Sequence, residues 1–329
     1  MNAVKQYINS HVDYASNRNR IVEMRKDSLL KSFEQKLKNQ DLSARTISGY
    51  LTDILFFKKW AAQIYGKEVP FSQIVKEDIK AFRQDLLTIK RQKATSINRR
   101  LQSLKRFFDW AHRDKRIKTN PCISVRFVRI QRSNQPHSLN KKEVHALLRA
   151  AGQSKHGLAT RNYAFIQLAL QTGMRIGEIV KLQFRDLSIQ ERIGSVRVID
   201  GKGIRERKVP LNATARRALS AYLKEKNLQP DDFVFLTKRG KPVTIRGLQF
   251  VVQTLGGKAH IKRVKLTAHI LRHTFAMNFL QANEGKLVEL ASLLGHESLN
   301  TTAIYTRSSE ESLAKSIENI ETNIYDAAS

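Results

Sequence analysis

Apolar residues recur every three or four positions through the first 115 residues, which is the spacing of a helix with one buried face. Polar breaks divide this region into four helical segments, at residues 27–38, 44–66, 76–89 and 94–113. Ser43 can cap the start of the second helix, and Gly66 can end it. The fourth helix carries a continuous apolar stripe: Ile97, Leu101, Leu104, Phe107, Phe108 and Ala111. Four helices in a segment of this length predict a small all-α bundle.

The helical spacing is lost between residues 119 and 138, where Pro121 and Pro136 indicate a linker with a short extended stretch. Asn140 can cap a new helix, and a second domain is expected to start there. Its helices are predicted at residues 140–151, 158–172, 212–226, 244–255, 268–282 and 286–294. Three short β-like runs lie among them, at Gln183–Ile189, Ser195–Asp200 and Arg207–Leu211. Gly201-Lys202-Gly203 suits a turn between the last two runs. The pattern predicts a mixed α/β, mainly helical domain with a small antiparallel sheet.

The last twenty residues are acidic, with five Asp or Glu against one Lys. Their apolar residues fall at the spacing of one helix face: Leu313, Ile317, Ile320 and Ile324. This amphipathic helix is too acidic to bind DNA and should pack on protein, either its own domain or a neighbouring subunit. The expected layout is an N-terminal extension, a helical domain, a linker, a second domain and a C-terminal helix, at residues 1–25, 26–118, 119–138, 139–309 and 310–329.

The chain is strongly basic, with 59 Lys and Arg against 29 Asp and Glu, a net charge of +30. Such an excess usually serves a polyanionic partner. The segment Lys80–Arg116 alone holds twelve Lys or Arg and three Asp or Glu, so one basic face is expected on the helical domain. Arg99, Arg100 and Arg106 are the predicted DNA contacts there. Charge alone leaves a ribosomal-type RNA binder and a membrane-surface protein as alternatives.

Several classes of protein are excluded by composition. No stretch of about 18 apolar residues is present, so a transmembrane helix is not expected, and the N-terminus lacks the apolar core of a secretory signal. Cys122 is the one cysteine, which excludes an internal disulfide and a multi-cysteine zinc site. Cys122 is expected to be a small core residue, and the absence of disulfides fits a cytoplasmic protein.

Candidate chemistry is carried by short motifs in the second domain. Arg175 lies between two glycines where one helix ends and another starts, and His269 and Arg272 share a helix face. His296 follows a glycine at a helix end, and Tyr305 comes nine residues later. Taken singly, each has an ordinary structural explanation: a surface arginine beyond a helix end, a structural histidine, or a core tyrosine.

The presence of all these motifs in one chain, and the order in which they occur, are more specific than any single motif. The sequence contains, in this order, TGMRIGE, GKGIRER, HILRH, LLGH and AIYTR. In this it resembles the tyrosine recombinase (phage integrase) family, whose hallmark is two arginines, a lysine, two histidines and a tyrosine. The resemblance covers the whole chain and is strongest from about Leu139 to Arg307. It implies that Arg175 is the first arginine and Lys202 the β-hairpin lysine, and that His269 and Arg272 are the His-x-x-Arg pair. By the same resemblance, His296 is the second histidine, Tyr305 is the nucleophile and Glu178 is a supporting acid.

The resemblance implies cleavage of a DNA phosphodiester without metal or cofactor. Negative charge builds up on the non-bridging oxygens of the phosphate in the transition state. Arg175 and Arg272 can each donate paired hydrogen bonds to these oxygens, and His296 is expected to donate another. The two arginines take the place that metal ions fill in other nucleases.

The same resemblance assigns the covalent step to Tyr305, which would attack the phosphate and form a 3′-phosphotyrosine ester. A tyrosine hydroxyl has a pKa of about 10 and needs help to lose its proton. His269 is the candidate base, and Lys202 is the candidate acid that protonates the leaving 5′-oxygen. The ester stores the bond energy, so a second 5′-hydroxyl can reverse the step and strands can be exchanged.

The resemblance also implies an assembly on double-stranded DNA. The helical domain and the second domain would form a clamp around the duplex, with a dimer at each inverted-repeat core site and a homo-tetramer joining two sites. The C-terminal helix, with Leu313, Ile317 and Ile320, would dock on the neighbouring protomer. Accessory proteins are further candidate partners, and a membrane is not.

Some alternatives stay open at this point. A type IB topoisomerase or a telomere resolvase uses similar chemistry, and a DNA-binding accessory protein with degenerate chemistry would share the fold. About 25 residues precede the first predicted helix, too few for the arm-binding module of larger integrases, so the layout is closer to Xer-type recombinases and mobile-element integrases or resolvases. The sequence does not identify the target DNA.

Overall fold

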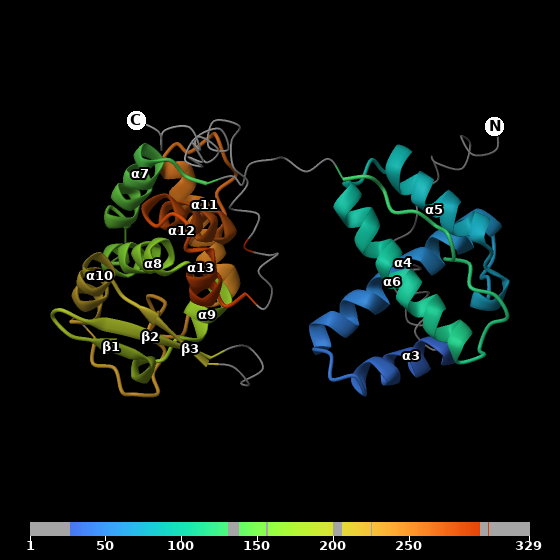
Figure 1. Cartoon of the computed structure of the whole chain (residues 1–329), viewed down its shortest axis with the longest axis horizontal. Coiled ribbons are helices and arrows are strands. Elements are labelled where there is room, and N and C mark those ends of the chain that lie inside the picture. Colours follow the sequence, from blue (N-terminus) through green and yellow to red (C-terminus); the bar gives the residue numbers. More distant parts are fainter. Residues whose placement is uncertain are drawn as a thin grey trace, which may run out of the picture. The chain divides into compact units, whose positions relative to one another are not determined.

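The computed structural model describes residues 27–130, 138–155, 157–199, 206–224 and 226–296, together with Thr302. The chain divides into two compact units, residues 1–132 and 133–329 (Figure 1). The predicted extension 1–25, the predicted turn Gly201-Lys202-Gly203 and the predicted helix 310–329 lie outside the described residues.

The first unit is helical, as predicted. Its elements are α3 Ser28–Lys38, α4 Ala44–Tyr65, the short 3₁₀ helix η2 Phe71–Gln73, α5 Lys76–Thr88 and α6 Ala94–Arg113. Side-chain caps fix where these helices begin: the Asp27 carboxylate accepts from the Leu29 amide at 2.9 Å, and the Ser43 hydroxyl accepts from the Thr46 amide at 3.2 Å. Gly66, in the left-handed region at φ 68°, ends α4 as expected.

Aromatic side chains fill the core of this unit, where α6 packs against α3, α4 and α5. Phe33 and Phe107 meet edge to face, with ring centroids 5.2 Å apart, and Phe57 and Phe82 do the same at 5.1 Å. Such pairs stabilise the unit beyond their buried area, by about 0.5–1.5 kcal/mol each.

The segment after α6 belongs to the same core. Cys122, Val125 and Val128 are buried against it, so Cys122 is a core residue, as predicted. Asn98 holds the backbone of Val128 on both sides, donating to its carbonyl at 2.8 Å and accepting from its amide at 2.7 Å. The packed unit therefore continues beyond residue 118, where the sequence had indicated that a linker begins.

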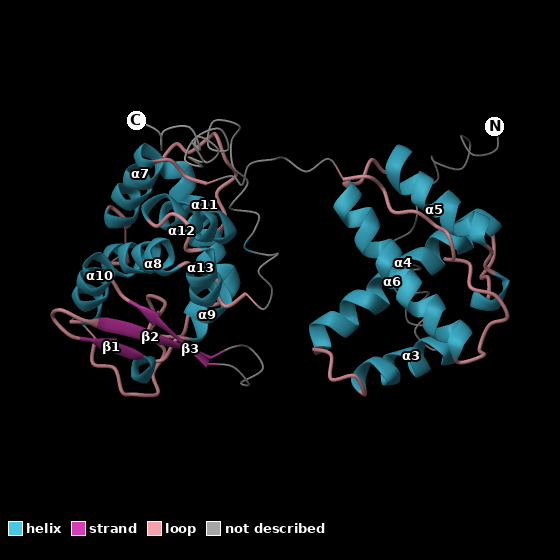
Figure 2. Ribbon diagram, viewed as in Figure 1, coloured by secondary structure: helices cyan, strands magenta, loops and turns pink. Residues whose placement is uncertain are grey.

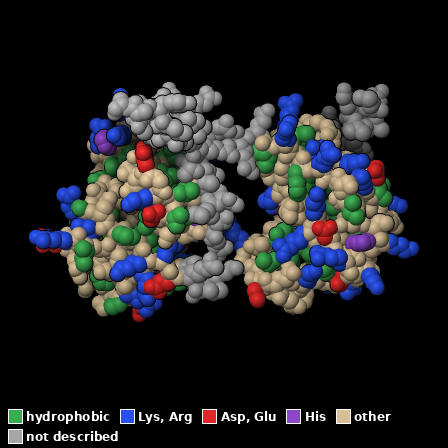
Figure 3. Space-filling view, in the orientation of Figure 1, with side chains coloured by type: hydrophobic (Ala, Val, Ile, Leu, Met, Phe, Trp, Pro, Cys, Tyr) green, Lys and Arg blue, Asp and Glu red, His purple; other side chains and the backbone are tan. Residues whose placement is uncertain are grey.

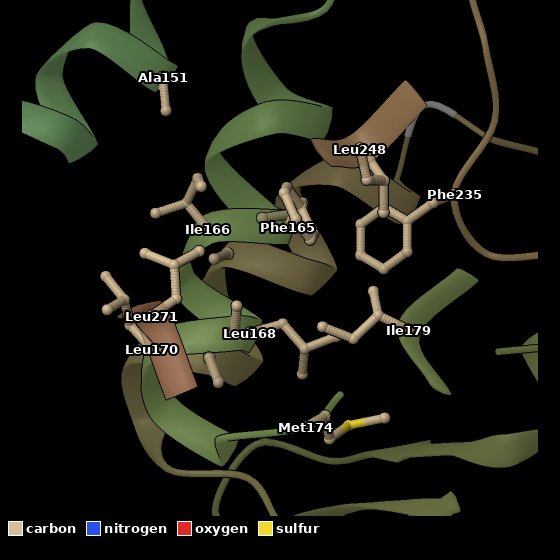
Figure 4. Close-up of a cluster of buried hydrophobic side chains, with 14 of the residues drawn as sticks. Ala151, Phe165, Ile166, Leu168, Leu170, Met174, Ile179, Phe235, Leu248 and Leu271 are labelled. Atoms are coloured by element: carbon tan, nitrogen blue, oxygen red, sulfur yellow. The ribbon is translucent and has the colours of Figure 1, made fainter. Parts of the chain in front are cut away.

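The second unit is mainly helical, and its helices pack around a central one, α8. Its helices are α7 Lys141–Gly152, α8 Ala159–Thr172, α9 Ile176–Lys181, α10 Ala213–Leu223, α11 Ile245–Lys258, α12 Ala268–Ala282 and α13 Leu287–Leu294. Helix α8 is buried along most of its length and packs against α7, α10 and α12. Its Phe165, Ile166 and Leu168 lie at the centre of the core, near Ile179 and Phe235 (Figure 4).

Three antiparallel strands form a sheet beside these helices, in the order β1 Leu187–Ile189, β2 Gly194–Ile199 and β3 Glu206–Pro210 (Figure 2). Val196 pairs with both Leu187 and Val209 and is fully buried. The first predicted run, Gln183–Ile189, was too long: residues 184–186 form the 3₁₀ helix η3 Phe184–Asp186, because the Asp186 carboxylate accepts from the Gln183 amide at 3.1 Å. The fold class predicted from the sequence is otherwise confirmed.

Lys and Arg side chains are spread over the visible faces of both units, with Asp and Glu among them (Figure 3). Within the described ranges, no helix is both long and apolar enough to cross a bilayer.

Candidate active site

Three arginines from separate parts of the second unit meet at the C-terminal turn of α13, residues 293–295 (the α13 turn). The last carbonyls of a helix have no partner within it and carry partial negative charge. Guanidinium groups supply the missing hydrogen bonds here. Arg207 Nε donates to Leu293 O at 3.0 Å, and Arg272 Nη2 donates to Leu294 O at 2.7 Å. Arg175 donates twice, from Nη1 to Leu294 O at 3.3 Å and from Nη2 to Gly295 O at 3.1 Å.

Arg175 stands at the start of α9, just after the end of α8. The chain turns there at Gly173, whose φ is +62°, and a Cβ atom at Gly173 would lie 2.3 Å from Phe275 and 2.8 Å from Leu294. Only glycine fits that backbone and that space. The sharp turn brings Arg175 to the α13 turn while leaving its side chain 45% exposed.

Glu178, on the first turn of α9, joins two of the arginines. Its carboxylate accepts from the Arg175 amide at 2.8 Å, from Arg175 Nη1 at 3.0 Å, and from Arg207 Nη1 and Nη2 at 3.1 and 2.8 Å. Burial alone would raise the pKa of Glu178, but the hydrogen bonds and charge of Arg207, followed by those of Arg175, lower it below its ordinary value. Glu178 thus contacts Arg175, the residue that it is expected from the sequence to support.

Arg272, on α12, is 5% exposed. Its Nη1 donates to Gly173 O at 2.8 Å, and its Nη2 lies 2.8 Å from Nε2 of His296. The other ring nitrogen, Nδ1, lies 2.8 Å from the hydroxyl of Thr302, which is fully buried.

The pKa of His296 is lowered to about 4 by burial and then by the positive charges of Arg272, Arg175 and Arg207. The ring is therefore neutral at pH 7. Because a guanidinium can only donate, Nε2 accepts from Arg272 and Nδ1 carries the proton that is shared with Thr302. In this arrangement the expected donor role of His296 requires the ring to gain or move a proton when a phosphate binds.

The structure thus brings together Arg175, Glu178, Arg272 and His296. His269 is exposed one turn before Arg272 on α12, with its ring centroid 6.3 Å from that of His273. Lys202 and Tyr305 lie outside the described residues.

Arg207 was not among the predicted site residues. One signal could have found it: in β3 it shares the inward side with buried Val209, and an arginine on the inward side of a strand needs partners.

In the first unit, the predicted DNA contacts are held by neighbouring side chains. Arg99 pairs with the buried Asp53 but stays 57% exposed. Arg100 lies over the Phe56 ring at 4.3 Å, and burial lowers the pKa of its side chain, which is 17% exposed. The guanidinium group of Arg106 lies over the ring of Tyr50, 4.9 Å from the ring centroid. Of these, Arg99 has the most surface to offer a phosphate.

Comparison with known proteins identifies the family. The model of the phage integrase family matches residues 137–312, and that of the N-terminal SAM-like domain of phage integrases matches residues 30–115. The chain belongs to the phage integrase family of tyrosine recombinases. It is therefore an enzyme of site-specific recombination that cleaves and rejoins DNA.

Relatives agree over almost the full length. The chain is 30% identical to tyrosine recombinase XerC of Pediococcus pentosaceus over 302 residues, which are 88% of this chain and 96% of that protein. It is 32% identical to tyrosine recombinase XerD of Listeria monocytogenes over 274 residues, 80% of this chain and 88% of that protein.

Solved structures share the fold. The recombinase XerH bound to a palindromic difH substrate has a TM-score of 0.71 at 23% identity, covering 94% of this chain and 90% of that one. A lambda integrase dimer bound to a core site has a TM-score of 0.67 at 18% identity, covering 83% and 96%.

Proposed function

We propose that Arg175 and Arg272 hold the scissile phosphate while Tyr305 attacks it and forms a 3′-phosphotyrosine ester. The observation that carries this proposal is the convergence of the two guanidinium groups on the α13 turn, where both donate to Leu294 O. Each is fixed in advance by backbone carbonyls, so little ordering is left for the moment of reaction. Loss of one such preorganised donor typically costs about 10²–10³-fold in rate.

Proton transfers are assigned to residues around this phosphate site. His269, exposed near the start of α12, is the base for the Tyr305 hydroxyl, and Lys202 is the acid for the leaving 5′-oxygen. The negative phosphate would raise the pKa of His296 and favour the protonated ring, which can then donate to a phosphate oxygen. We expect no metal or cofactor, because the arginines supply the positive charge.

We further propose the division of labour and the assembly. The helical domain, from residue 26 through the packed segment that ends near Val128, grips the duplex, and residues 139–309 catalyse the reaction. The assembly would be a dimer on each inverted repeat and a tetramer when two sites are joined, with residues 310–329 docked on a neighbouring protomer. This proposal is supported by two structures with the same fold, XerH bound to a palindromic difH substrate and a lambda integrase dimer bound to a core site. We place the enzyme in the cytoplasm, with accessory proteins as further partners.

The test is capture of covalent protein–DNA adducts from a genomic DNA library in the presence of EDTA. Wild type, Tyr305→Phe and the control Tyr163→Phe are compared, since Tyr163 lies on α8 outside the proposed site. We expect adducts with wild type and Tyr163→Phe, none with Tyr305→Phe, and trapped DNA that maps to a short inverted repeat. Adducts that survive in Tyr305→Phe would overturn the assignment of the nucleophile.

A further inference from the structure

The strongest unassigned feature of the second unit is the half-buried side chain of Arg207. It is 16% exposed, and its planar group makes three hydrogen bonds in two directions. Nη1 and Nη2 donate to the two carboxylate oxygens of Glu178 at 3.1 and 2.8 Å, and Nε donates to Leu293 O at 3.0 Å. Strand β3 packs against α13 at this point.

The α13 turn fits closely against the guanidinium group of Arg207. A Cβ atom at Gly295, whose φ is +64°, would lie 2.9 Å from Arg207 Nη1 and 3.0 Å from its Cζ. The glycine backbone therefore rests on the arginine, and the turn cannot shift toward β3 without displacing it.

Both partners of Arg207 also hold the arginines of the proposed phosphate site. Glu178 accepts from Arg175, and the α13 turn accepts from Arg175 and Arg272. Without Arg207, the full charge of Glu178 would fall to Arg175 and draw its guanidinium away from the turn. The turn itself would lose the bond that fixes it to β3.

We propose that Arg207 is a positioning residue for DNA cleavage, which fixes Glu178 and the α13 turn and, through them, the guanidinium groups of Arg175 and Arg272. This inference rests on the proposed function, since it assumes that those groups hold the phosphate. Arg207 also lies five positions after Lys202, so it anchors the strand that follows the proposed acid.

Lysine cannot replace Arg207 in this role. A guanidinium is a rigid planar fork that can bond a carboxylate with two groups and a carbonyl with a third, whereas an ammonium is a single point charge on a flexible stem. Arg207→Lys keeps the charge and loses the fork, which separates positioning from simple electrostatics.

The experiment measures single-turnover cleavage on the DNA captured by the wild-type enzyme, at saturating protein, together with DNA affinity. We expect Arg207→Lys to cleave about 10- to 100-fold more slowly, the size of effect that a small misplacement of reacting groups produces. DNA affinity should stay within about twofold of wild type, because the guanidinium nitrogens of Arg207 already donate to Glu178 and to Leu293 O rather than to a phosphate.

Two control variants make the result specific. Lys208→Gln removes a charge from the next, exposed position of β3 and should cleave at the wild-type rate. Leu219→Ala removes part of a fully buried α10 side chain, destabilises the unit away from the site, and should also cleave normally at a temperature where it is folded.

A double-mutant cycle then tests the route of the effect. If Arg207 acts through Arg175, the loss caused by Arg175→Lys is smaller in the Arg207→Lys background than in wild type. Additive losses, wild-type cleavage by Arg207→Lys, or an equal loss in Leu219→Ala would each overturn the inference. Failure of the proposed function looks different, because wild type itself would then form no adduct that depends on Tyr305.

Discussion

Replacement of Glu178 by glutamine tests the charge network behind the candidate site. The side chain of Glu178 is 10% exposed and binds two cations, Arg175 and Arg207. Glutamine has nearly the same shape but no charge, and its amide nitrogen would point a donor at guanidinium groups that can only donate. The substitution therefore removes attraction without removing volume.

The free energy of unfolding that Glu178→Gln loses can be worked out from the burial of the side chain. Removal of one partner from a buried ion pair costs about 3–5 kcal/mol. Arg175 is 45% exposed and can turn to water, and glutamine keeps one accepting oxygen, so we expect a loss of about 2–4 kcal/mol. For a unit of this size, about 3 kcal/mol corresponds to a fall of roughly 6–12 °C in the melting temperature.

The loss should also depend on pH. The pKa of Glu178 is lowered in the folded protein, so its contribution is fully present above the ordinary value of 4.5 and is lost as the pH falls through the lowered value. Calorimetry at pH 7 and at successively lower pH follows this loss, with the exposed Glu284→Gln as the charge-matched control. A melting temperature equal to that of the control at pH 7, or a deficit that does not shrink in acid, would refute the reasoning.

Three further predictions concern separate features. NMR titration of His296 should give a pKa of about 4, and a titration midpoint near 6.5 would contradict the buried, arginine-bound ring. The stabilisation that the neutral ring contributes should be lost as the pH falls from 6.5 to 4, because the unfolded ring takes up a proton before the folded one. Gly173→Ala should lower the free energy of unfolding in urea by about 2–4 kcal/mol, because the added Cβ atom would combine a strained φ with a clash. Gly240→Ala, at φ +72° with open space around it, should lower the free energy of unfolding by only about 1 kcal/mol, and equal losses for the two variants would contradict the close packing at Gly173. Arg99→Gln should weaken DNA binding and flatten its salt dependence, while Arg100→Gln should mainly lower thermal stability; the reverse pattern would mean that the two roles are exchanged.

Much of the fold could be predicted from short-range signals. Ser43, Gly66 and Asn140 stop or start helices by chemistry that acts within a few residues, and their helices lie where expected. The segment around Val128 was assigned to a linker because it has no period; it is held by the side chain of Asn98, and no spacing rule reports such a bond. Likewise, the turn at Asp186 ended the first β-like run earlier than its apolar residues suggested.

The candidate site divides in the same way. The family resemblance implies that Arg175, Arg272 and His296 belong to one site, and the structure brings their side chains close together. The common anchor of the two arginines, the α13 turn, could not be predicted, because backbone carbonyls carry no sequence signature. Nor could Thr302 as the partner of His296, since that hydrogen bond depends on where the chain runs after α13.

The central claim is that Tyr305 forms the covalent bond to DNA. Its most direct test is mass spectrometry of the trapped adduct after digestion with nuclease and trypsin. Tryptic cleavage after Lys286 and Arg307 gives a peptide in which Tyr305 is the one tyrosine. The account predicts a nucleotide phosphate on that tyrosine, and a phosphate linked to any other residue would contradict it.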